Sequence, residues 1–382
     1  MQRFGKLTSL VPLGRRRWAF GALGARSLSD GMQDEYGKMD ASGNTYRLEN
    51  YSLELGDELP EVEIRYKTFG KLNEAKDNVV VVCHALTGNA SLDEWWGTML
   101  GPGRSFDTNR FFIVCANVIG SCYGSTGPTS VDPKTGKLYG NAFPDVTIRD
   151  SVKAHLEMVK EGIGANGIHA VVGGSLGGMQ TLEWALIGGE FVKKAVVIGC
   201  GSEHTAWQIG ISEAQRQCIY ADPKWNGGDV DMSDPPRRGL GVARQQAMLS
   251  YRTAKAYHDK FGRDTKKPAG GKEQFQVRSY LEYQGTKFED RFDAISYLKI
   301  TEQMDTHDVG RGRGGAEVAL SQMKAQVMVV GIDSDILYPL HEQEALHAAI
   351  PGAEMRVIRS DEGHDGFLLE QDQLAKFIDN FI

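Results

Sequence analysis

The fold is decided by the stretch Ala170-Val-Val-Gly-Gly-Ser-Leu-Gly-Gly-Met-Gln180. A short apolar run typical of a buried strand leads into Gly173-x-Ser175-x-Gly177, and a helical sequence comes after it. A sharp strand-to-helix turn of this kind raises one serine hydroxyl above the C-terminal edge of a sheet. The glycines are needed because a Cβ at either position would collide with the neighbouring strand or helix. Such a turn has many uses, so its meaning depends on residues further along the chain.

An acid and a histidine come later in that order, each directly after a strand-like run. The apolar run 325–332 ends before Asp333 and Asp335, and a second run ends shortly before His364. The chain order Ser, Asp, His is that of the α/β-hydrolases. We prefer Asp335 over Asp333 as the acid because it stands further beyond the strand end, although spacing alone leaves both open. The sequence predicts a catalytic triad of Ser175, Asp335 and His364 at one sheet edge.

These residue types suit acyl transfer through a serine ester. A serine hydroxyl is a poor nucleophile at neutral pH, so His364 would take its proton while Asp335 holds the second ring nitrogen. The oxyanion would be bound by the backbone N–H of Leu176, the residue after the nucleophile. The amide of Leu86, which comes after a valine-rich strand, is the expected second donor. The residues alone do not say whether water or another hydroxyl accepts the acyl group.

The bulk composition is that of a soluble α/β protein. The chain has 382 residues, 41% of them hydrophobic, and a net charge of −7, which gives no support to nucleic-acid binding. No apolar stretch approaches the roughly 20 residues that span a membrane. The five cysteines have no metal-ligand spacing, so we expect reduced thiols and no metal site. They are Cys83, Cys115, Cys122, Cys200 and Cys218.

The first 32 residues differ from the rest. No acidic residue precedes Asp30, and hydrophobic residues are interspersed among basic ones. The basic residues are Arg3, Lys6, Arg15, Arg16, Arg17 and Arg26. This composition predicts a targeting segment over 1–32, and a mitochondrial enzyme. The alternative is a basic tail on a cytoplasmic protein.

Strand and helix patterns alternate along 45–202 and again along 306–382, which predicts one α/β core with a mostly parallel sheet. Between them, 203–305 has longer-period polar sequence with helical tracts. These tracts are Ile209–Tyr220, Leu240–Tyr257 and Gln274–Leu298. Because such a segment is too long for a loop in a compact domain, we expect a helical insertion over the sheet edge, a lid.

Beyond the triad, the chain resembles the homoserine O-acetyltransferase family of the α/β-hydrolase superfamily, from about residue 45 to its end. The matching motifs are long and specific. They are Cys83-His-Ala-Leu-Thr-Gly88, Trp95-Trp-x4-Gly-Pro-Gly103, Asn117-x-Ile-Gly-Ser-Cys-Tyr-Gly-Ser-Thr-Gly-Pro128, Gly174-Ser-Leu-Gly-Gly-Met-Gln180, Leu182-Glu-Trp184, Arg216-Gln-x-Ile219, Asp305-Thr-His-Asp-Val-Gly-Arg-Gly-Arg-Gly-Gly315, Ser334-Asp-x-Leu-Tyr-Pro339 and Gly363-His-Asp365.

The resemblance implies a two-step transfer in methionine biosynthesis. Ser175 would take the acetyl group from acetyl-CoA, the co-substrate, with no permanently bound cofactor, and L-homoserine would then accept it. It also implies that Arg244 grips the α-carboxylate and Asp365 pairs with the α-ammonium group. A homodimer is expected. The arginines of 307–315 would either approach the coenzyme phosphates or belong to a structural loop.

Three alternatives share the triad. The acceptor could be L-serine, the donor could be a succinyl thioester, or the protein could be an esterase that hydrolyses its acyl-enzyme. The stretch Gly120–Pro128 favours homoserine as the acceptor.

Overall fold

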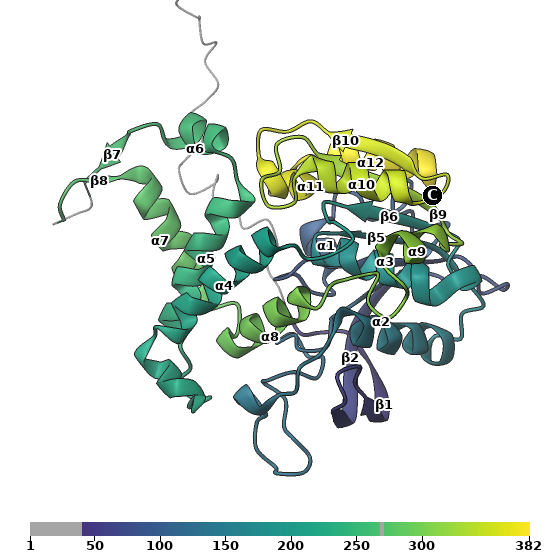
Figure 1. Ribbon diagram of the computed structural model, residues 1–382, viewed down its shortest axis with the longest axis horizontal. Coiled ribbons are helices and arrows are strands. Elements are labelled where there is room, and N and C mark those ends of the chain that lie inside the picture. The colour runs from purple at the N-terminus through teal and green to yellow at the C-terminus, as the bar shows by residue number, and fades with distance from the viewer. Residues whose placement is uncertain (1–39, 268–270) are drawn as a thin grey trace, which may run out of the picture. The chain divides into compact units, whose positions relative to one another are not determined.

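The computed structural model describes residues 40–267 and 271–382 (Figure 1). The predicted targeting segment, 1–32, lies outside them. The strands are β1 (Asn44–Ser52), β2 (Glu58–Gly70), β3 (Val79–Cys83), β4 (Phe112–Ala116), β5 (Ile168–Gly174), β6 (Lys194–Ile198), β7 (Thr265–Lys266), β8 (Gln274–Phe275), β9 (Gln326–Ile332) and β10 (Glu354–Ile358). The helices are α1 (Leu92–Trp95), α2 (Ile148–Glu157), α3 (Leu176–Gly188), α4 (Ala206–Tyr220), α5 (Arg237–Tyr251), α6 (Ala254–Phe261), α7 (Gln276–Glu289), α8 (Ala294–Asp305), α9 (Ala316–Ser321), α10 (Leu340–Ala349), α11 (Gly366–Leu369) and α12 (Gln371–Phe381).

One eight-stranded sheet organises the core, in the order β1-β2-β4-β3-β5-β6-β9-β10. The first two strands are antiparallel to their neighbours, and the strands from β4 to β10 run parallel. Because β5, β9 and β10 point the same way, the residues at their C-terminal ends lie at one sheet edge. This is the mixed, mostly parallel sheet that the sequence predicts.

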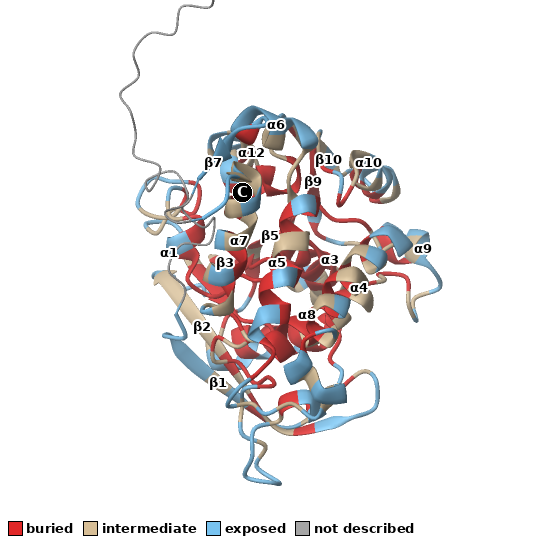
Figure 2. Ribbon diagram, turned by 90° about the vertical axis from the view of Figure 1, so that its left-hand side faces the viewer, coloured by how far each residue is buried: buried red, intermediate tan, exposed pale blue. Residues whose placement is uncertain are grey.

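Alternate residues of the central strands face two different hydrophobic layers. Val79 and Val81 pack into the layer that also contains residues of α2 and α3, whereas Val80 and Val82 face the layer that contains residues of α1 and α12. This alternation follows from the two-residue repeat of a strand. Since both faces are covered, β3 is valine-rich and buried throughout. Figure 2 shows buried segments in red inside the molecule and exposed segments in pale blue around its edges.

Helices α4 to α8 follow β6 in the chain and lie together beside the sheet in Figure 1, and α9 comes after them, before β9. The tract 240–257 is two helices rather than one, because α5 ends at Tyr251 and Thr253 caps α6 by accepting a hydrogen bond from the Ala256 amide at 2.9 Å. The tract 274–298 is likewise divided into α7 and α8. The role of this insertion as a lid remains a prediction.

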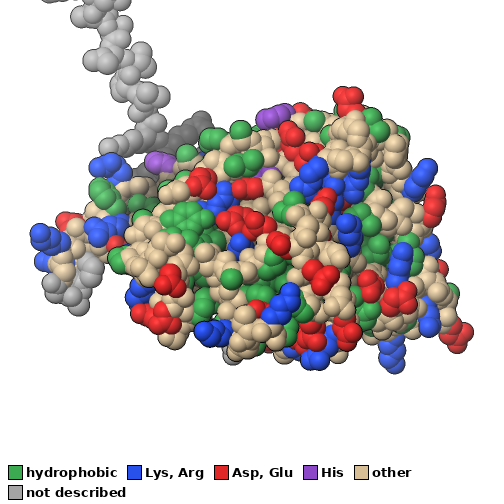
Figure 3. Space-filling view, turned by 60° about the horizontal axis from the view of Figure 1, so that its bottom comes forward, with side chains coloured by type: hydrophobic (Ala, Val, Ile, Leu, Met, Phe, Trp, Pro, Cys, Tyr) green, Lys and Arg blue, Asp and Glu red, His purple; other side chains and the backbone are tan. Residues whose placement is uncertain are grey.

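None of the helices in the described residues is both long enough and apolar enough to cross a membrane. On the face seen in Figure 3, acidic and basic side chains are interspersed.

Candidate active site

Ser175 occupies a strained turn between β5 and α3. Its backbone angles are φ 58° and ψ −124°, a combination that a residue with a Cβ rarely adopts. The two flanking glycines make this turn possible. A Cβ on Gly173 would lie 2.3 Å from the carbonyl oxygen of Gly177, and one on Gly177 would lie 2.2 Å from the carbonyl oxygen of Cys83. The sequence G-x-S-x-G therefore results from close backbone packing.

His364 is buried and joined to Asp335. Its Nδ1 lies 2.6 Å from Oδ2 of Asp335. The other carboxylate oxygen of Asp335 accepts hydrogen bonds from the amides of Leu337 and Tyr338, at 2.8 and 2.9 Å, which fixes its orientation. Asp333 points elsewhere: it pairs with Arg359 at 3.2 Å and lies partly exposed. Of the two candidate acids, the structure thus brings Asp335 to the histidine.

The surroundings of His364 raise its pKa above the usual 6.5. Burial alone would lower the pKa, but the charge of Asp335, the hydrogen bond to it and the charge of Asp365 outweigh that effect. Within the described part of the chain, Nε2 of His364 is buried and has no hydrogen-bond partner. The ring packs against Tyr338 and Tyr251, with centroids 5.2 and 6.1 Å away.

Ser175 lines a small cavity of about 20 Å³, little more than the room that one water needs. Tyr338 and Tyr251, which flank His364, line the same cavity. The full lining is Leu86, Ser175, His204, Ile211, Ser212, Gln215, Tyr251, Met304, Leu337 and Tyr338. Residues of the sheet edge and of α4, α5 and α8 therefore enclose the serine together.

The two predicted oxyanion donors stand beside Ser175. Leu86 lines the cavity, and Leu176 is the first residue of α3, where backbone amides have no partner within the helix. Neither amide donates a hydrogen bond to another group of the described residues. The positive end of the α3 dipole adds to their attraction for negative charge.

The two predicted substrate-binding residues are not among those that line this cavity, and both contact other side chains. Arg244, on α5, is buried, with its guanidinium 5.6 Å from the ring centre of Tyr251 and 5.2 Å from that of Phe288. Asp365, next to His364 in the chain, pairs with Nε of Arg252 at 2.7 Å. The sequence interpretation missed Arg252, because it placed this residue inside a continuous helix.

His204 is a cavity residue that the sequence interpretation also missed. It lies just after β6, and its Nδ1 is 3.1 Å from the hydroxyl of Tyr338. Burial, with the nearby charges of His307 and Arg216, lowers its pKa to about 3, so it is neutral at pH 7. The only sequence signal was its place in the segment that follows a strand. His84, at a strand end, accepts from the Val118 amide at 3.2 Å, and burial lowers its pKa to about 4, which suits a structural role.

The arginines of the glycine-rich loop contact two carboxylates, the buried Glu183 and the partly buried Glu54. Arg313 pairs with Glu183 at 2.6 Å, and Arg311 pairs with Glu54 at 2.9 Å. Arg149 joins both carboxylates, at 3.0 and 2.9 Å. Because Glu183 is on α3, this network fixes the loop against the helix that begins at Ser175. These contacts favour a structural role for the loop arginines.

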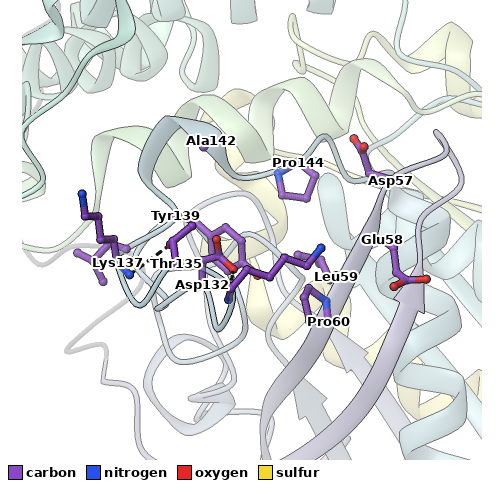
Figure 4. A pocket seen from close by; sticks show the side chains of 12 residues that line it. Asp57, Glu58, Leu59, Pro60, Asp132, Thr135, Lys137, Tyr139, Ala142 and Pro144 are labelled. Atoms are coloured by element: carbon purple, nitrogen blue, oxygen red, sulfur yellow. Dashed lines mark hydrogen bonds between the residues drawn. The ribbon is translucent and has the colours of Figure 1, made fainter.

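A larger pocket, of about 610 Å³, lies among β2 and the segment 132–144 (Figure 4). It is lined by carboxylates, lysines and prolines, including Asp57, Asp132 and Lys137, and none of the predicted site residues contributes to it. It holds no nucleophile with an adjacent base, so we do not assign the chemistry to it. In the described residues no group of three or more His, Cys, Asp or Glu side chains is placed to hold a metal ion.

The fold and this constellation define a class of proteins. A family model described as the alpha/beta hydrolase fold matches residues 78–371 of the chain. The structure is also similar to that of esterase E22, with a TM-score of 0.81 and 23% identity over 88% of this chain and 98% of that one. At this identity the likeness concerns the fold alone.

More specific relatives narrow the class. The homoserine O-acetyltransferase of Chlorobaculum parvum is 46% identical over 342 residues, which cover 90% of this chain and 95% of that protein. The crystal structure of homoserine O-acetyltransferase from Bacillus anthracis has a TM-score of 0.81 and 24% identity, and the match, which covers 88% of this chain and 96% of that one, again concerns the fold alone. The chain belongs to the homoserine O-acetyltransferase family.

The prediction of a mitochondrial enzyme is wrong. The similar homoserine O-acetyltransferases come from bacteria, among them Chlorobaculum parvum, Trichormus variabilis and Salinibacter ruber. Bacteria have no mitochondria, so this relationship points to an enzyme of the cytoplasm. A basic, acid-poor composition was not sufficient to identify a mitochondrial address.

Proposed function

We propose that the protein transfers an acetyl group from acetyl-CoA to the hydroxyl of L-homoserine, a step of methionine biosynthesis. Relatives named homoserine O-acetyltransferase, 46% identical over most of the chain, support this activity. The observation that carries the mechanism is the pair of Asp335 and His364, 2.6 Å apart, beside the strained serine at one sheet edge.

In the first step, the Ser175 hydroxyl attacks the thioester carbonyl while Nε2 of His364 takes its proton. The carbonyl oxygen becomes negative and is bound by the amides of Leu86 and Leu176. The C–S bond then breaks, and the sulfur leaves with the proton from His364. The products are free coenzyme A and an acetyl ester on Ser175.

The second step repeats the first with a different nucleophile. The L-homoserine hydroxyl gives its proton to His364 and attacks the acetyl carbonyl, and Ser175 leaves with that proton. Arg244 binds the α-carboxylate of the amino acid, and Asp365 pairs with its α-ammonium group. Asp335 keeps His364 in the tautomer with the proton on Nδ1 and stabilises the imidazolium form. No metal or bound cofactor is required.

Transfer succeeds only if water is kept from the acetyl ester. We assign this task to the insertion 203–305, acting as a lid, because α4, α5 and α8 contribute side chains to the walls of the serine cavity. The cavity of about 20 Å³ has no room for either substrate, so we infer that this lid opens during turnover.

We also propose a homodimer. Val242 and Leu249 on α5 are 38% and 52% exposed, and burying such side chains between two copies would be favourable. Light scattering across a concentration series measures the mass directly, and a monomer throughout would refute the proposal.

The decisive assay crosses two donors with two acceptors. Thiol release from acetyl-CoA and succinyl-CoA is monitored with L-homoserine, with L-serine and with no acceptor. We expect rapid release for acetyl-CoA with L-homoserine alone. Release with L-serine but not L-homoserine would contradict the acceptor, a preference for succinyl-CoA would contradict the donor, and release independent of any acceptor would indicate an esterase.

A further inference from the structure

The helical insertion meets the catalytic loop at one small seam, which we define as residues 251–255 and 361–365. The first segment is the break between α5 and α6, where Arg252 has extended backbone angles. Its side chain contacts two carboxylates of the second segment: Nε pairs with Asp365 at 2.7 Å, and Nη1 pairs with Glu362. The guanidinium fork suits two carboxylates at once.

The backbones on the two sides of the seam touch. Gly363 has a φ of +69°, and a Cβ on it would lie 2.8 Å from the carbonyl oxygen of Tyr251. The hydroxyl of Thr253 donates to the carbonyl of Asp361, and Lys255 pairs with the Asp361 carboxylate at 2.9 Å. Because His364 is the next residue after Gly363, the seam reaches the catalytic histidine directly.

Consecutive residues of the seam face different spaces. Tyr251 lines the serine cavity, whereas Arg252 lines an outer cleft of about 410 Å³. Tyr257, Tyr280 and Glu362 also line that cleft. Arg252 and Glu362 therefore lie at the inner side of the outer cleft, one residue along the chain from Tyr251 of the serine cavity.

The seam carries charged groups of both signs. It contains three carboxylates, those of Asp361, Glu362 and Asp365, against two permanent cations, Arg252 and Lys255. The side chains of Arg252 and Asp365 are only 13% and 8% exposed, so the charges are weakly screened.

We propose that Arg252 is a positioning residue that closes this seam. It holds Asp365 beside His364, where that carboxylate meets the α-ammonium group of the amino acid, and it keeps water of the outer cleft from the acetyl ester. The proposal rests on the proposed acetyl transfer. The step that it prevents is hydrolysis, in which water attacks the acetyl carbonyl, gives a proton to His364 and releases acetate as Ser175 recovers that proton.

The test compares Arg252→Met with the wild type in the full-length protein. Acetyl-CoA hydrolysis without an acceptor should rise about tenfold relative to transfer, and the KM for L-homoserine should rise about tenfold, because Asp365 is no longer held in place. The KM for acetyl-CoA should change less than about twofold. A loss of thermal stability with an unchanged ratio of hydrolysis to transfer would show a merely structural role and overturn the proposal.

Arg252→Lys and Glu362→Gln extend the test should Arg252→Met not fold. Lysine keeps the charge but cannot contact both carboxylates as the fork does, so we expect partial rescue. Glu362→Gln should raise the ratio of hydrolysis to transfer less than Arg252→Met does, because the contact between Arg252 and Asp365 remains. The matched control is Arg278→Met, since Arg278 is exposed on α7 and pairs with Glu282 there, and we expect no change.

Failure of the proposed role of Arg252 can be distinguished from failure of the proposed function. If the wild type does not transfer acetyl to L-homoserine, the proposed function fails. Deacylation after p-nitrophenyl acetate still reports access of water to the ester, and Arg252→Met should then deacylate about tenfold faster than the wild type. Equal deacylation rates would overturn the role of Arg252 in either case.

Discussion

The sheet edge and the seam position the same histidine by different physical means. At the sheet edge, Ser175 is fixed by backbone packing around two glycines, and Asp335 is held by two backbone amides. At the seam, Asp365 is held by the side chain of Arg252. Backbone packing leaves few alternative positions, whereas a side-chain ion pair can exchange partners. The difference suggests that chemistry depends on the sheet edge and protection of the intermediate on the seam.

The largest expected effect is at the sheet edge. Ser175→Ala removes the group that carries the acetyl ester, so turnover should fall on the order of 10⁴-fold or more. Thiol release from acetyl-CoA with L-homoserine measures it, and intact-protein mass spectrometry should show no acetyl adduct. Retained turnover would contradict the covalent mechanism. It would also contradict the view that the chemistry depends on the sheet edge rather than the seam.

Replacing Asp335, the acid of the triad, should reduce turnover nearly as much as replacing Ser175. Asp335→Asn should reduce turnover about 10³- to 10⁴-fold, because the amide can no longer hold His364 in the productive tautomer and stabilise its charged form. The matched control is Asp333→Asn, two residues away, whose carboxylate pairs with Arg359 instead. Equal losses in the two variants would show that the 2.6 Å contact between His364 and Asp335 does not matter to catalysis.

Much of this sheet edge could be predicted because its constraints are local. The apolar runs, the glycines around Ser175 and the order of Asp335 and His364 can all be seen without knowing what packs where. Asp333 and Asp335 could not be separated by spacing, because the choice depends on how the chain turns after β9. The backbone amides of Leu337 and Tyr338 orient Asp335 there.

The seam was less predictable because it depends on tertiary contacts. The sequence from 240 to 257 has helical character throughout. Thr253 caps α6 locally, and contacts with the loop 361–365 stabilise the extended residue Arg252 before it. His204 was missed for a similar reason: a single histidine after a strand carries no signal until Tyr338 lies beside it. The mitochondrial location was inferred from the composition of residues 1–32 alone, and the relatives contradict it.

A pH profile distinguishes the contribution of Asp365 to the pKa of His364 from that of Asp335. The raised pKa keeps this histidine protonated, and therefore unable to accept a proton, up to a higher pH, so acetylation by acetyl-CoA should fall as the pH drops through that pKa. Asp365→Asn removes one of the charges that raise it, so the acid limb of the acetylation step should move to lower pH. Rapid-quench measurement of acetyl-enzyme formation avoids the need for L-homoserine.

The control for this profile is Asp361→Asn, because the Asp361 side chain is 63% exposed and belongs to the same loop. We expect its acid limb to stay where the wild type has it. A shift of equal size in both variants would mean that the general charge of the loop, rather than Asp365, sets the proton affinity of His364.

The smallest expected effect is at the outer end of the seam, and it sharpens the comparison. Lys255 pairs with Asp361 at 2.9 Å, but the two side chains are 59% and 63% exposed, and such pairs contribute little. Lys255→Met should therefore change the ratio of hydrolysis to transfer less than about twofold, against about tenfold for Arg252→Met. Thiol release with and without L-homoserine measures both ratios. If Lys255→Met matched Arg252→Met, closure would depend on the charge of the whole seam, and the buried contact between Arg252 and Asp365 would lose its special role.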